Sequence, residues 1–152
     1  MDISNIFYAK TDVTHGRGYV YCLQYHIVWV TKYRKPVLTG PVETDLKRLL
    51  TEIASDLDIH IDAMETMPDH VHLLIETKPQ CRLSDAIKVF KGTSAWHLFQ
   101  LHPELKHSLW GGHMWNPSYF VVTVSDRSFE QVEAYIESQK TRPGIGGRPR
   151  KY

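Results

Sequence analysis

The sequence predicts an α+β fold of the ferredoxin-like (RRM-like) class, with an antiparallel sheet in β-α-β-β-α-β order and one more helix at the C-terminal side. Three observations lead to this prediction. Segments rich in β-branched and aromatic residues alternate with segments whose apolar residues recur every three or four positions. The turn sequence Met67-Pro68-Asp69 joins two apolar segments closely enough for an antiparallel hairpin. A further helical pattern follows the last expected strand.

The first half of the chain supplies a strand, a helix and the hairpin. Residues 19–31 (YVYCLQYHIVWVT) are typical of a strand, which we expect in the middle of the sheet. Pro36 and Pro41 bracket a loop, after which residues 42–57 place their leucines at helical spacing. Residues 60–66 alternate apolar and polar side chains, and the chain returns as a strand over 70–76.

The second half supplies a helix, a strand and the terminal helix. Residues 83–101 predict a helix that Gly92 weakens slightly, and an irregular stretch follows it. Residues 118–125 (SYFVVTVS) predict a strand, and Ser128 is a suitable N-cap for a helix that runs to residue 139. We therefore expect an N-terminal extension over 1–17, one domain over 18–140 and a flexible basic tail over 141–152.

Composition restricts the classes of function that need to be considered. The chain has 152 residues, 42% hydrophobic and 23% charged, as in globular rather than disordered proteins. It lacks an apolar run of roughly 20 residues and a signal-like N-terminus, so we expect a cytoplasmic protein with no membrane span. Its two cysteines cannot form a disulfide framework. The net charge of +1 means that any surface for nucleic acid must be local.

A histidine pair marks a possible metal site. His70 and His72 are two residues apart in an expected strand, so both imidazoles point to the same face, near an edge or end of the sheet. Imidazole is a common ligand for divalent metals, although two ligands do not complete a site. The alternative interpretation is a half-exposed sheet face with no ligand.

A tyrosine and an amide share one face of the expected last helix. Tyr135 and Gln139 are four residues apart, about one helical turn. A phenol oxygen can attack phosphorus and form a covalent phosphotyrosine, and its high intrinsic pKa requires activation that a metal on the phosphate would supply. The amide oxygen of Gln139 could complete the metal shell. The plainer alternative is a partly buried tyrosine whose hydroxyl meets water.

These residues occur in a combination that resembles the single-tyrosine HUH transposases, or transposases A, of small bacterial insertion sequences that move as single-stranded DNA. The resemblance extends from about residue 18 to residue 139. It is carried by five segments of this sequence: YHIVW at 25–29, TKYR at 31–34, MPDHVHLL at 67–74, WNPSY at 115–119 and YIESQ at 135–139.

The resemblance implies a homodimer with a joined sheet, with His70 and His72 as the HUH metal pair, Tyr135 as the nucleophile and Gln139 as the third ligand. It implies cleavage that leaves a 5′-phosphotyrosine and a free 3′-hydroxyl, with Mg²⁺ or Mn²⁺ and without a nucleotide cofactor. It further implies recognition of DNA hairpins at the element ends by a nucleoid-associated enzyme. Residues 125–127 would form a hinge that lets the tyrosine helix move between subunits.

Five basic side chains are candidates for contacts with DNA phosphates: Lys32, Arg34, Lys35, Lys88 and Lys91. Their plainer interpretation is a solvated surface. Two other functions share part of the pattern, namely a domesticated HUH endonuclease that cuts chromosomal repeat hairpins and a non-catalytic single-strand-binding module. A structural zinc protein would need a closed shell of four ligands, for which the sequence offers no second close pair.

Overall fold

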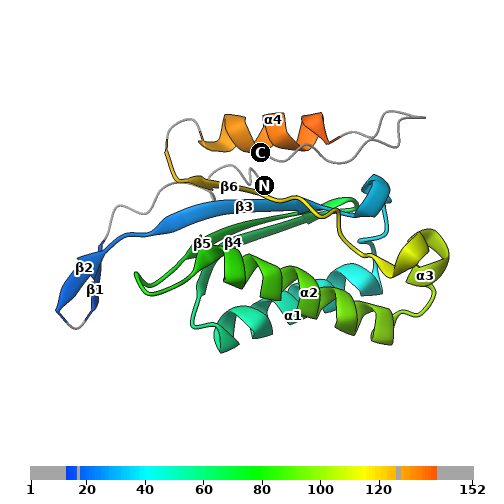
Figure 1. Ribbon diagram of the computed structural model, residues 1–152, viewed down its shortest axis with the longest axis horizontal. Coiled ribbons are helices and arrows are strands. Elements are labelled where there is room, and N and C mark those ends of the chain that lie inside the picture. The colour runs from blue at the N-terminus through cyan, green and yellow to red at the C-terminus, as the bar shows by residue number, and fades with distance from the viewer. Residues whose placement is uncertain (1–12, 17, 126–127, 140–152) are drawn as a thin grey trace.

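A four-stranded antiparallel sheet forms the centre of the computed structural model, which describes residues 13–16, 18–125 and 128–139 (Figure 1). Its strands are β3 (Gln24–Val30), β4 (His60–Met67), β5 (His70–Glu76) and β6 (Phe120–Thr123), in the spatial order β4-β5-β3-β6. The two inner strands, β3 and β5, are neighbours in the sheet but are not consecutive in the sequence, so no hairpin joins them. With the helices, this order is the expected ferredoxin-like β-α-β-β-α-β arrangement.

Two helices cover one face of the sheet (Figure 1). Helix α1 (Pro41–Asp56) begins with a proline at its first turn, where the missing N–H costs nothing, and α2 (Leu83–Leu101) follows the hairpin. Alternate residues of β3 and β5 point toward these helices and join the main core, including Ile27, Trp29 and Leu73, which are fully buried. The remaining residues of the two strands therefore face the opposite side.

Helix α4 (Ser128–Ser138) lies on that opposite face (Figure 1). Val132 and Tyr135 of α4 pack on Val28 of β3, and the partly buried side chains beside them include Phe120 and Ile136. This cluster is small compared with the core on the other face, so α4 is held to the sheet by few apolar contacts.

The expected elements were confirmed with three differences. The first expected strand divides into β2 (Tyr19–Tyr21) and β3, and β2 pairs with β1 (Thr14–Gly16) across a turn in which Gly18 has φ 82°. Residues 105–112 form α3 (Leu105–Ser108) and the short 3₁₀ turn η3 (Trp110–Gly112). Strand β6 is shorter than expected at both ends: it ends two residues early, and it begins two residues late, where the backbone N–H of Ser118 donates to Oδ1 of Asn116.

The expected basic tail, most of the N-terminal extension and two of the three hinge residues lie outside the described residues. Among the helices that the structure describes, none combines the length and the apolar character needed to cross a bilayer.

Candidate active site

His70 and His72 lie at the beginning of β5, on the sheet face that α4 covers. His70 pairs in register with Val30 of β3 and His72 with Val28, so the two imidazoles occupy adjacent positions of one face. Strand β5 is an inner strand, which places the pair at an end of the sheet rather than at its edge. His72 is buried, and the ring of Phe129 in α4 lies 6.5 Å from it between centroids.

The environment of His72 keeps its imidazole uncharged. Its Nε2 atom lies 2.8 Å from Nδ1 of His26, a buried histidine of β3. Burial, together with the positive charge that His26 and His70 can carry, lowers the pKa of His72 to about 3. Burial also lowers the pKa of His26. A neutral imidazole retains the lone pair that a metal ligand needs.

The environment of His70 fixes its tautomer. Its Nδ1 atom lies 2.8 Å from Oδ1 of Asp69. Burial raises the pKa of this carboxyl, but hydrogen bonds from His70 and Arg34 outweigh burial and hold the pKa below its ordinary value. Because the carboxylate accepts hydrogen bonds, Nδ1 carries the proton and Nε2 presents its lone pair. A carboxylate behind a histidine is the usual support of a metal ligand.

This donor set fits a divalent metal in part. His70 presents Nε2, whereas Nε2 of His72 lies 2.8 Å from Nδ1 of His26. Within residues 13–16, 18–125 and 128–139, no three His, Cys, Asp or Glu side chains gather as a metal site. The amide oxygen expected from Gln139 would be a third ligand of another type, and that role stays a prediction.

Tyr135 is a buried residue of α4 whose hydroxyl contacts Ser118. The two oxygens are 2.9 Å apart, and the phenol ring stacks on Phe120 with centroids 5.1 Å apart. Ser118 Oγ donates its own proton to Oδ1 of Asn116, so the phenol is the donor in the bond between the two hydroxyls. Ser118 precedes β6 in the sequence. Strand β3 lies between β6 and the histidine strand β5, so β5 and β6 are roughly 10 Å apart.

The structure thus brings the helix of Tyr135 onto the histidine face and anchors the phenol on the β6 side of that face. The C-terminal end of α4 is linked to the histidine side through Arg34, which contacts both Asp69 and the carbonyl of Ile136. Gln139 directly follows this end, and its Nε2 lies 3.5 Å from Oγ of Ser138. Its expected role as a metal ligand stays a prediction.

The five basic candidates for phosphate contact fall into two groups. Arg34 donates to Asp69 and Ile136, and Nζ of Lys91 lies within 3.3 Å of the carbonyl oxygens of three consecutive residues, 116–118. Burial lowers the pKa of Lys91 to about 8. Lys35 and Lys88 are exposed and Lys32 is half-buried. Phosphate contact stays a prediction for all five, and Arg34 and Lys91 would have to exchange protein partners for phosphate.

Three residues of this site had no role in the expectations from sequence: His26, Asp69 and Ser118. Asp69 directly precedes His70, and that adjacency was a usable signal for a supporting carboxylate. His26 is a histidine in a largely apolar strand, but only the strand register places it beside His72. Ser118 lies in the WNPSY segment, but nothing in the sequence points to its contact with Tyr135, which depends on how α4 packs on the sheet.

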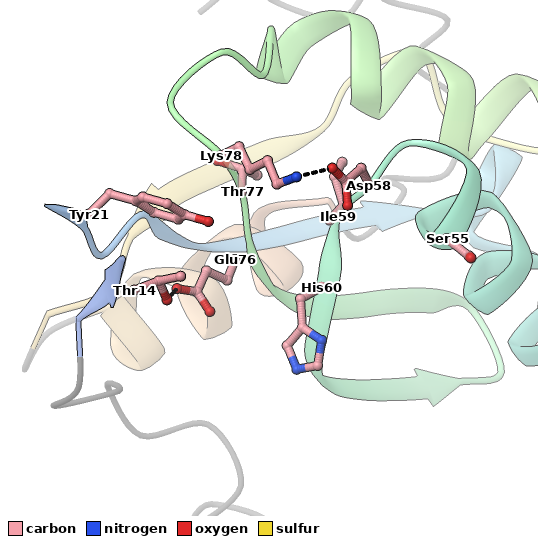
Figure 2. A pocket seen from close by; sticks show the side chains of 9 residues that line it. All are labelled: Thr14, Tyr21, Ser55, Asp58, Ile59, His60, Glu76, Thr77 and Lys78. Atoms are coloured by element: carbon pink, nitrogen blue, oxygen red, sulfur yellow. Dashed lines mark hydrogen bonds and ion pairs between the residues drawn. The ribbon is translucent and has the colours of Figure 1, made fainter. Parts of the chain in front are cut away.

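A second pocket, of about 460 Å³, lies at the other end of β5 (Figure 2). Glu76 lines it and stands six positions from His70, roughly 20 Å along a strand. Thr14 Oγ1 donates to Glu76 at 2.7 Å, and Lys78 forms an ion pair with Asp58. The first bond ties β1 to the end of β5, and the ion pair ties the residues that follow β5 to the turn before β4. Because of its distance along β5, the pocket is separate from the histidine pair.

Comparisons with known proteins identify the family. A family model described as "Transposase IS200 like" matches residues 19–139. The chain is 48% identical to the ISDra2 transposase TnpA of Deinococcus radiodurans over 84% of this chain and 91% of the relative. It is 27% identical to the transposase for insertion sequence element IS200 of Salmonella typhimurium, over 81% of this chain and 80% of that protein.

A crystal structure from Deinococcus radiodurans R1 matches the fold with a TM-score of 0.80 and 46% sequence identity, covering 85% of this chain and 99% of that chain. The match to the family model covers more than half of the chain and includes both histidines, the tyrosine and the glutamine. The chain belongs to the IS200-like transposase family.

Proposed function

We propose that this transposase cleaves and rejoins single-stranded DNA at insertion-sequence ends, with Tyr135 as the nucleophile. His70, His72 and Gln139 would hold Mg²⁺ or Mn²⁺, and the substrate would carry DNA hairpins near its cleavage sites. One observation carries the proposal: α4, which bears Tyr135, packs on the sheet face that presents both histidines, with Phe129 against His72. The similarity to two insertion-sequence transposases supports the same substrate class.

The proposed step conserves the energy of the broken bond. The phenol oxygen of Tyr135 bonds to phosphorus, and the bond from phosphorus to the 3′ oxygen breaks. The phenol proton passes through solvent to the departing 3′ oxygen, which leaves a 5′-phosphotyrosine and a free 3′-hydroxyl. Attack by another 3′-hydroxyl reverses these changes and joins the strands. When bound, a divalent metal neutralises charge on the scissile phosphate.

The residues around the site suit this chemistry. Asp69 orients His70, and burial keeps His72 neutral, so His72 does not have to lose a proton before it binds metal at neutral pH. Ser118 accepts the hydrogen bond of the phenol, so the hydroxyl of Tyr135 has a protein partner that DNA has to displace. Release from Ser118 is then part of activating the nucleophile.

The edge of the sheet beside Tyr135 supports a homodimer with a joined sheet. Within the described part of the chain, β6 pairs only with β3, and its outer side adjoins a groove of about 700 Å³. The groove is mostly apolar and lies between β6 and α4, with Val121, Ala134 and Tyr135 in its walls. An unpaired strand edge next to apolar surface favours pairing with the same strand of a second copy.

A covalent-trapping experiment tests the proposed function. The full chain is mixed with Mn²⁺ and single-stranded DNA from the ends of its own element, and the products are separated on a denaturing gel. A protein–DNA adduct that is lost in Tyr135→Phe, in His70→Ala and with a chelator supports the proposal. Cleavage that persists in Tyr135→Phe excludes this nucleophile, and binding without cleavage under any metal favours the single-strand-binding module.

The domesticated endonuclease would share this chemistry and differ in its substrate and assembly. It would act on repeated chromosomal hairpins, and as a monomer. Adduct formation on element ends but not on chromosomal repeats, by a dimer in solution, supports the insertion-sequence function. The reverse preference by a monomer supports the domesticated enzyme.

A further inference from the structure

Arg34 joins the histidine side of the site to the helix that carries Tyr135. Its Nε and Nη2 atoms donate to Oδ2 of Asp69 at 3.0 and 2.6 Å, and its Nη1 donates to the carbonyl oxygen of Ile136 at 2.8 Å. The other carboxylate oxygen of Asp69, Oδ1, accepts a hydrogen bond from Nδ1 of His70. One half-buried guanidinium therefore links the turn before β5 to α4, which is otherwise held to the sheet by a small apolar cluster and the hydrogen bond between Tyr135 and Ser118.

The backbone that presents Arg34 is strained. Tyr33 and Arg34 have φ values of 56° and 51°, consecutive left-handed positions that glycine or asparagine ordinarily occupies. The strand end just before them is fixed, because the N–H of Thr31 donates to the carbonyl of Asp69 at 2.9 Å. A long side chain in such a conformation indicates that the contacts of that side chain offset the strain.

The acceptor at the other end of Arg34 is suited to a cation. Ile136 lies in the last turn of α4, at the negative end of the helix dipole, and its carbonyl oxygen also accepts the N–H of Gln139 at 3.2 Å. Its backbone is adjacent to Tyr135, and Gln139 follows one turn later. A guanidinium bound here restrains the turn that holds the nucleophile.

We infer that Arg34 is a positioning residue, which holds the last turn of α4 in a fixed relation to His70 by bridging Asp69 and the main chain of Ile136. The inference rests on the proposed function, since it concerns the same nucleophile and metal pair. It differs from phosphate contact, because Nε, Nη1 and Nη2 of Arg34 each donate to a protein oxygen. The two roles predict different losses on substitution.

Hydrogen exchange of the full chain, without metal or DNA, tests the bridge directly. In Arg34→Gln we expect the amides of residues 132–138 to exchange about tenfold faster, while those of β3 keep their rates. Arg34→Lys should resemble Arg34→Gln, because one amine cannot replace a planar guanidinium that spans two acceptors. Arg48→Gln, which removes an exposed ion pair to Glu52, is the matched control and should change nothing in α4.

The rate of adduct formation separates positioning from phosphate binding. At saturating single-stranded DNA and Mn²⁺, Arg34→Gln should lower the rate about tenfold and change the Kd for DNA by less than about twofold. Exchange in α4 that stays at the wild-type rate, or that Arg34→Lys restores, overturns the inference. A weaker Kd with a reduced salt dependence and an unchanged adduct rate also overturns it and returns Arg34 to the phosphate contacts.

Failure of the proposed function is distinguishable from failure of this inference. If the wild-type chain forms no adduct, the proposed function fails, and the exchange experiment alone decides whether Arg34 restrains α4. If the wild-type chain forms the adduct and Arg34→Gln matches it in both measurements, only the role of Arg34 fails.

Discussion

Nδ1 of His26 lies 2.8 Å from Nε2 of His72, and both rings are buried on the sheet face that α4 covers. Burial lowers the pKa of each histidine, to about 3 for His72. In the unfolded chain both would return to ordinary values near 6.5. The unfolded state therefore binds more protons than the folded state below that pH, and folding stability must fall as the pH is lowered.

The pH dependence of stability follows with a definite sign. For the metal-free protein, the free energy of unfolding should fall as the pH drops below about 6.5, by about 1.4 kcal/mol per pH unit for His72 down to its folded pKa of about 3, and His26 should add to the loss. Urea unfolding at several pH values between 7 and 4 measures it. His72→Gln should reduce this slope by about one proton. The control His60→Gln, at an exposed histidine, should keep the wild-type slope, and an unchanged slope in His72→Gln would contradict the buried neutral pair.

Asp69 should matter for metal binding more than for DNA binding. Asp69→Asn removes the carboxylate that orients His70, and we expect Mn²⁺ affinity to fall about tenfold. Isothermal titration calorimetry of Mn²⁺ measures the effect. Asp56→Asn, at an exposed carboxylate at the end of α1, is the control and should retain wild-type affinity. Equal affinities in the two variants would show that Asp69 does not support a metal ligand.

The two lysines of α2 should have different roles: Lys91 a structural role and Lys88 a role in phosphate binding. Lys91→Gln loses the bonds to the loop over 116–118 and should lower the free energy of unfolding by about 1–3 kcal/mol. Lys88→Gln, at an exposed lysine, should leave stability unchanged and reduce the salt dependence of DNA binding by about one ion. Urea unfolding and salt titrations of DNA binding compare the two. A loss of stability in Lys88→Gln, with a change in salt dependence only in Lys91→Gln, would contradict these roles.

The groove beside β6 gives a prediction about assembly. Ala134→Arg places a charged side chain in the apolar groove and should convert a dimer to a monomer, as measured by sedimentation velocity. Gln100→Arg, an added charge on an exposed position of α2, should remain a dimer. A dimer that survives Ala134→Arg would place the interface elsewhere.

Much of the fold could be predicted from sequence because its elements are strongly periodic. The bounds of β5 and α2 agree with the expected ranges, since turn residues and prolines delimit both. The β1–β2 hairpin escaped prediction because three-residue strands carry too little periodicity. The start of β6 was placed too early because the N–H of Ser118 donates to the side chain of Asn116 rather than to a neighbouring strand.

The site was predictable only where its residues are close in sequence. His70 and His72 could be assigned to one face from their spacing alone. The contacts of Arg34 with Ile136 and of Tyr135 with Ser118 connect residues 102 and 17 positions apart, and they depend on how α4 packs on the sheet. Arg34 is basic and follows a strand, so its sequence context favoured a phosphate contact over an internal bridge.

The most direct test of the central claim is to locate the covalent bond by mass spectrometry. The adduct formed with single-stranded DNA and Mn²⁺ is digested with trypsin and nuclease, and the peptide that retains a nucleotide is sequenced. We predict the nucleotide on Tyr135, linked through its 5′-phosphate, in a product that Tyr135→Phe cannot form. A nucleotide on any of the other seven of the eight tyrosines, or an adduct that survives in Tyr135→Phe, would contradict the account.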